Sequence, residues 1–230
     1  MGLTVMNALT ATLAANAAGS GQILYIDPIS PADIVAPGFV DMGVFPEGFR
    51  LSPNVEVTRE DLKGAGRESA ASITLASNVT DSSYGYEFSI LTPDDNVRAL
   101  HAGSPPAELT GTGLTGVKAY RISTEATVVA RWVFVKKRPD GSADVVFHPR
   151  VQISSNGTTD GDQGSELLGF VVTVQAFSWT PGAALAGLTP ESVSQYGALF
   201  RAKTPAQLDA LLTALNTVAV PEPEPDPENP

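Results

Sequence analysis

An alternating pattern inside the segment from Gly64 to Gly103 constrains the fold more than any other feature of the sequence. Apolar side chains occupy every second position from Tyr84 to Ile90, and small or polar side chains lie between them. This period of two is typical of a β-strand with one buried face. Such a strand needs a sheet beside it and a core beneath it. We therefore expect the chain to build a β-sheet fold around this strand.

A helix start follows the strand directly. The sequence from Thr92 to Asp95 contains a hydroxyl that can accept from first-turn amides, a proline, and two acidic residues that favour the positive end of the helix dipole. Thr92 is the candidate helix cap, and Gly103 is expected to close the helix. Val97 and Leu100 are three residues apart and give this helix an apolar stripe.

Composition favours short strands joined by turns. The 230-residue chain contains 21 glycines and 18 prolines, and only 17% of its residues are charged. It has no cysteine, so disulfides and thiolate metal sites are excluded. The net charge of −11 argues against tight binding of nucleic-acid phosphates, because each contact needs one of only 14 lysines and arginines. The same charge suits a surface that repels DNA.

The order of patterns predicts four segments. Residues 1–21 lack positive charge, which argues against a cleaved signal peptide and favours an N-terminal arm. Residues 22–180 form the main domain. Residues 181–219 are expected to be a helical C-terminal appendage, with a second Thr-Pro helix start at Thr204. Residues 220–230 are an acidic, proline-rich tail that is expected to be disordered.

The main domain has about seven strand patterns. Residues 126–136 are apolar on both faces, which is typical of a central strand covered on both sides. The turn at 139–141 predicts an antiparallel hairpin. Residues 53–66, with a charged stretch at 58–63, are expected to form a long exposed loop. The pattern predicts a mainly β fold, an antiparallel β-sandwich or partly open barrel with one short flanking helix.

Catalytic and ligand-binding motifs are weak. The run GTGLTG at 111–116 matches a dinucleotide fingerprint, but a strand pattern follows it where a helix is needed. With two histidines, no cysteine and no Gly-x-Ser-x-Gly elbow, a nucleophilic triad has weak support. The acidic loop at 156–166 could serve a hydrolase or bind calcium, but its spacing differs from a twelve-residue calcium loop. We therefore expect a protein that is not an enzyme and uses no cofactor or metal.

The order of these features resembles the major tail tube proteins of long, non-contractile-tailed bacteriophages. The resemblance covers residues 22–180. Its first half rests on short motifs and strands: Asp41, Gly43 and Gly48 in an Asp-x-Gly-x-x-x-x-Gly segment, Leu51 to Pro53, Glu60 to Leu62, and the strands 72–75 and 84–90. Its second half rests on a long strand with Trp132, the Arg138 to Gly141 turn, a strand entering Pro149, and a last apolar strand.

This resemblance implies a β-sandwich subunit, six copies of which close into a ring, and rings that stack into a tube through which phage DNA passes. The implied partners are other copies of the chain, a tape-measure protein, and the tail terminator and distal tail proteins. DNA is expected only in transit, no membrane is involved, and the location is the virion after assembly in the host cytoplasm. The alternative is a β-sandwich binding or adhesion module, such as a capsid decoration or cell-surface protein.

Candidate assembly residues follow from this expectation. Glu87 lies opposite the apolar face of the 84–90 strand and is the best candidate for a charge that faces the lumen. The candidates for contacts between rings come from the charged stretch at 58–63 and from the nearby Arg67. They are Arg59, Glu60, Asp61, Lys63 and Arg67. The 53–66 loop and the N-terminal arm are expected to reach the next ring.

Overall fold

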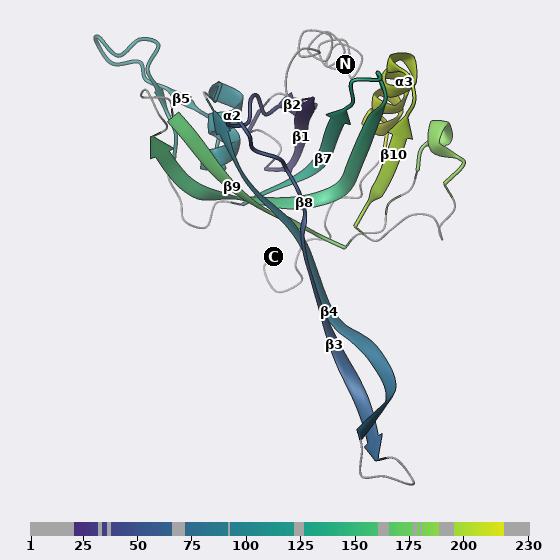
Figure 1. Cartoon of the computed structure of the whole chain (residues 1–230). Helices are drawn as coiled ribbons and strands as arrows, with labels where there is room; N and C mark the ends of the chain where they lie inside the picture. The colour runs from purple at the N-terminus through teal and green to yellow at the C-terminus, as the bar shows by residue number, and fades with distance from the viewer. Residues whose placement is uncertain are drawn as a thin grey trace.

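One large antiparallel sheet dominates the computed structural model (Figure 1). The structure describes residues 21–31, 34–35, 38–65, 72–91, 93–121, 127–160, 166–176, 179, 181–188 and 196–218. The sheet has the strand order β2-β1-β7-β8-β9-β4-β3, and β10 pairs with the first part of β8. The mainly β, antiparallel fold that the strand patterns predict is therefore confirmed.

The elements have the following bounds. The strands of the large sheet are β1 (Gln22–Ser30), β2 (Val40–Asp41), β3 (Asn54–Ala65), β4 (Ser72–Leu91), β7 (Thr127–Lys137), β8 (Ala143–Asp160), β9 (Glu166–Val174) and β10 (Ala198–Ala202). A separate two-stranded ribbon consists of β5 (Ala107–Glu108) and β6 (Lys118–Ala119). The helices are α2 (Asp95–Ala102), the 3-10 turn η3 (Ala183–Leu185) and α3 (Pro205–Asn216). No helix among the described residues is long and apolar enough to cross a bilayer.

The sheet curls toward a barrel without closing. A single bridge between Val44 and Leu91 joins the segment after β2 to the end of β4, and the Leu91 amide donates to the Val44 carbonyl at 2.8 Å. Among the described residues no ladder pairs β2 with β4 or β3. Of the two predicted alternatives, a β-sandwich and a partly open barrel, this single curled sheet corresponds to the partly open barrel.

The central strands β1, β7 and β8 are covered on both faces. One face of β7, with Trp132 fully buried, packs with α2 and the inner face of β4 and β9. The other face, with Val133 and Val135, packs with α3 and Trp179. The predicted two-sided strand at 126–136 is confirmed because the C-terminal segment supplies the second cover. That segment also adds a strand, β10, which its sequence did not predict.

Helix α2 begins later than predicted. Its N-cap is Asp94, whose Oδ1 accepts from the Val97 amide at 2.8 Å, so the prediction of Thr92 as cap was wrong. Thr92 itself lies outside the described residues. Asp94 carries a full negative charge, which the helix dipole favours over a hydroxyl. Gly103 closes the helix in the left-handed conformation (φ 65°), as expected.

The largest departure from the prediction lies in the segment 53–66, which was expected to be a loop, because its residues 54–65 form the strand β3. β3 pairs with β4 from Asn54 opposite Gly85 to Ala65 opposite Ser72. β-branched residues such as Val55 and Val57 favour this extended backbone, and charged side chains are compatible with a strand that water surrounds. A long hairpin therefore takes the place of the loop.

Several sequence-based expectations fall on residues outside the described ranges. They are residues 1–20 of the predicted N-terminal arm, Arg67, and the acidic tail at 220–230. These stay predictions.

Candidate functional site: the arm and the open face

The two-stranded arm is the most prominent feature of the molecule. We define the arm as residues 54–65 of β3 and 72–84 of β4, which leave the curled sheet together and extend away from it (Figure 1). The predicted ring-contact residues Arg59, Glu60, Asp61 and Lys63 all lie on its β3 strand. The arm therefore brings four of the five into one projecting element.

Gly85 is the point where β4 changes partners. It pairs with Asn54 of β3 on one edge and with Thr173 of β9 on the other. A Cβ at residue 85 would lie 2.7 Å from the Val172 carbonyl oxygen, closer than real Cβ atoms approach. Only glycine lets β4 and β9 come this close. Between Gly85 and Ser72, β3 is the one strand that pairs with β4 in the described part of the chain.

Apart from Tyr84 at the root, the described side chains of the arm are exposed on both faces. Every residue from Asn54 to Arg59 is exposed, and so are Ser82 and Ser83. Val55 and Val57 are 50% and 48% exposed, although they are apolar. A two-stranded ribbon without a packed face is at best marginally stable in water, and open strand edges are templates for pairing. An arm of this kind gains stability when it contacts another molecule.

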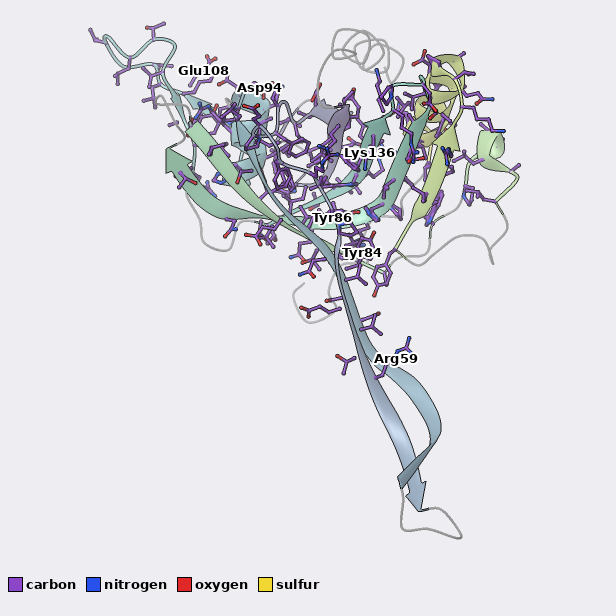
Figure 2. All side chains as sticks on the ribbon, viewed as in Figure 1. Arg59, Tyr84, Tyr86, Asp94, Glu108 and Lys136 are labelled. Atoms are coloured by element: carbon purple, nitrogen blue, oxygen red, sulfur yellow. The ribbon has the colours of Figure 1, made fainter. Side chains whose placement is uncertain are left out.

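An aromatic cluster holds the root of the arm. It consists of Tyr84, Tyr86, His148 and Tyr196, and Figure 2 shows the two β4 tyrosines where the arm meets the sheet. The Tyr84 ring stacks on the Tyr196 ring with centroids 5.7 Å apart. The Tyr86 hydroxyl lies 2.8 Å from His148 Nε2.

His148 is a neutral, fully bonded member of this cluster. Its Nδ1 bonds the Tyr196 carbonyl oxygen, which can only accept, so Nδ1 carries the proton and Nε2 accepts from the Tyr86 hydroxyl. His148 is 3% exposed, and burial lowers its pKa to about 4. Sequence reasoning missed this role, although a lone histidine in an apolar strand was a signal that could have found it.

The open face is the side of β4, β9 and β8 that turns away from the core. We define it by six residues: Glu87, Ser89, Val171, Thr173, Gln152 and Ser154. Glu87 is exposed while Tyr86 and Phe88 are buried, as the alternation predicts. Its Oε1 accepts from Asn156 Nδ2 at 2.8 Å. The face is polar apart from Val171, and none of the hydrophobic clusters in the described residues covers it.

A hollow of about 480 Å³ joins the arm to the open face. Asn54 and Glu56 line it from the arm, and Glu87, Val171 and Thr173 line it from the open face. The two surfaces are thus continuous, and a partner that contacts the arm root reaches Glu87 as well.

A second pocket of about 360 Å³ lies between α2 and the strands β8 and β9. His101 Nε2 is 2.9 Å from Ser155 Oγ and 3.1 Å from the Gly157 carbonyl oxygen. Because this carbonyl only accepts, Nε2 acts as a donor and is not placed to take a proton from Ser155. Burial also lowers the pKa of His101. The pair is consistent with a structural contact rather than a nucleophile and its base.

The charged groups of this pocket are paired with each other, Arg98 with Glu166 at 2.5 Å. Among the described residues no group of three histidine, aspartate or glutamate side chains is arranged to hold a metal ion.

The sequence matches no protein-family model and no curated protein.

Proposed function

We propose that this chain is a structural subunit that assembles with copies of itself into stacked hexameric rings, and that the rings form a bacteriophage tail tube through which DNA passes. The observation that carries the proposal is the arm. It is too long and too exposed to be explained by the fold of one subunit, because no described core residue lies on Asn54 to Arg59.

The arm supplies what a repeating contact needs. Packing the half-exposed side chains of Val55 and Val57 against a neighbour contributes about 1 kcal/mol each by removal of apolar area from water. Each subunit presents the same arm, so a contact that does not close on itself propagates from copy to copy. Stacked rings are one product of such a contact.

The open face supplies a wall suited to DNA in transit. It is polar, it carries the exposed carboxylate of Glu87, and it belongs to a chain with net charge −11. A wall of this kind repels phosphates and gives DNA no cations to hold it. We therefore place Glu87 on the lumen side, with strands pairing across subunits to cover the open sheet edges.

The remaining assignments follow from the same proposal. The tape-measure protein would lie inside the tube, and the tail terminator and distal tail proteins at its ends. The protein would act in the virion after assembly in the host cytoplasm, with no catalytic step and no cofactor.

Electron microscopy of the purified chain at rising concentration tests the proposal. We expect rings at low concentration and tubes of constant diameter at high concentration, with sedimentation boundaries that shift in parallel. A monomer that persists at every concentration and sediments with bacterial cells would instead support the adhesion module.

Replacing the arm by a short turn tests the element that carries the proposal. Residues 58–81 are exchanged for Asn-Gly, which retains the Val57 to Ser82 pair and suits a two-residue hairpin. We expect a folded monomer that forms no tubes at concentrations at which the unchanged chain assembles.

The matched control exchanges the exposed loop 110–116 for the same Asn-Gly turn, between Leu109 and Val117, whose backbones are already hydrogen-bonded at 3.0 Å. This variant is expected to form tubes. Tubes of normal length from the arm variant would show that the arm is dispensable.

A further inference from the structure

A residue from the C-terminal segment touches the arm beyond its pivot. The Tyr196 hydroxyl donates to the Ser82 carbonyl oxygen at 2.9 Å, and it lies 2.8 Å from Ser82 Oγ. Ser82 is three residues out along the arm from Gly85, where β4 leaves β9. A contact outside the pivot resists swinging of the arm, whereas a contact at the pivot itself would not.

The backbone next to Tyr196 is held tightly against β8. The His148 ring donates to the Tyr196 carbonyl. A Cβ at Gly197 would lie 2.0 Å from the Phe147 carbonyl oxygen and 3.0 Å from His148 Nδ1, and Gly197 has a φ of 133° that other residues rarely adopt. Glycine at this position is therefore what lets Tyr196 approach the arm root.

The elements after Gly197 fix this segment to the body of the molecule. β10 pairs with β8 from Ala198 opposite Phe147 to Ala202 opposite Ala143. Leu208, Leu212 and Leu215 of α3 are buried in the cluster on the same side of the sheet. Tyr196 is thus connected to a rigid part of the fold.

We propose that residues 196–218 act as a clamp that sets the direction of the arm in the isolated subunit. Without the clamp, the ladder around Gly85 and the contacts of the Tyr84 ring with Tyr86 and His148 still hold the arm at its root. These contacts lie next to the pivot, so they restrict the direction of the arm less than a contact at Ser82 does. With the clamp, its direction is fixed before a partner arrives, which reduces the ordering cost of any contact that the arm makes. The inference concerns the monomer and does not depend on the kind of assembly.

Spin-label distance measurements test the clamp directly. The chain has no cysteine, so cysteines introduced at Arg59 on the arm and Lys136 on the body are its only labelling sites. Both positions are exposed, and Figure 2 shows them on opposite sides of the arm root. Labelled chain is diluted with unlabelled chain so that only distances within one molecule are recorded.

Two substitutions weaken the clamp in different ways. Tyr196→Phe removes the hydroxyl that binds Ser82 and keeps the stacked ring, while Gly197→Ala displaces the backbone of the clamp. We expect the width of the Arg59 to Lys136 distance distribution to increase about two-fold in Tyr196→Phe and further in Gly197→Ala.

Tyr120→Phe is the matched control, since it removes a tyrosine hydroxyl bonded to Asp95 at 3.1 Å, away from the arm. Its distribution is expected to match that of the unchanged chain. If Gly197→Ala does not fold, Tyr196→Phe still decides the question. An unchanged width in Tyr196→Phe, or equal broadening in Tyr120→Phe, overturns the clamp.

Discussion

At the residue scale, the buried side chain of His148 connects β8 with Tyr86 of β4 and with Tyr196. Its protonation state therefore affects the stability of the fold. Its pKa is about 4 in the folded protein and 6.5 in the absence of burial. Below pH 6.5 the unfolded chain binds a proton that the folded chain does not. The stability that this histidine contributes is therefore complete above pH 6.5 and decreases as the pH falls toward 4.

We predict that His148→Gln removes about 3 kcal/mol of pH dependence from the free energy of unfolding between pH 6.5 and 4. A glutamine can accept from the Tyr86 hydroxyl and donate to the Tyr196 carbonyl without titrating. Urea unfolding of both proteins across this window measures the effect. Carboxylates and His101 titrate in both proteins, so their contributions cancel in the difference. Parallel curves would show that His148 is not the titrating group.

Among individual residues, the sequence predicted which side chains are buried and which are exposed, because this depends on the local pattern. Alternation placed Tyr86 and Phe88 in the core and Glu87 outside, and the structure agrees. It could not predict Gly85 as a pivot, because its constraint comes from the Val172 carbonyl of a strand far along the chain. The importance of His148 has the same origin, since its partners lie 62 and 48 residues away in sequence.

At the element scale, a buried ion pair joins the end of α3 to the sheet. Arg131 Nε donates to Asp27 Oδ2 at 2.7 Å, and Nη1 donates to the Val218 carbonyl oxygen at 2.9 Å, just after the helix ends. The Asp27 and Arg131 side chains are 8% and 14% exposed. Removing the cation leaves the buried Asp27 carboxylate without its countercharge and takes one donor from the Val218 carbonyl.

We predict that Arg131→Met lowers the free energy of unfolding by about 3 to 5 kcal/mol. Arg138→Met is the control, because Arg138 pairs with Asp144 at the exposed 139–141 turn, and its loss is expected to be far smaller. Urea denaturation of both variants measures the difference. Equal losses would mean that burial does not distinguish the two pairs.

The strands β3 and β10 were not predicted from the sequence, because neither shows the pattern of a strand with a buried face. Strands with a buried face, such as β7 and β9, show an apolar pattern that can be recognised in the sequence. In β3 the alternation is short, with Val55 and Val57 between polar residues. The described side chains from Asn54 to Arg59 are exposed, so no sustained apolar face marks this strand. β10 is five residues long and is defined by its pairing with β8, which depends on tertiary structure.

At the scale of the whole molecule, net charge opposes the proposed assembly through the arm. Each chain carries 25 acidic residues against 14 lysines and arginines, so neighbouring copies repel one another. Salt screens this repulsion, because the screening length falls from about 10 Å at 0.1 M to about 3 Å at 1 M. Contacts made by apolar side chains such as Val55 and Val57 are not weakened by the same change.

We therefore predict that the concentration at which the chain begins to assemble decreases several-fold as sodium chloride rises from 0.1 to 1 M. Light scattering across a concentration series at each salt level measures this threshold, and the thermal unfolding of dilute monomer serves as the control for changes in the fold. A threshold that rises with salt would show that attraction between opposite charges, such as Arg59 on the arm with a carboxylate of its neighbour, dominates the contact. In that case the apolar residues of the arm would not be its main source of affinity.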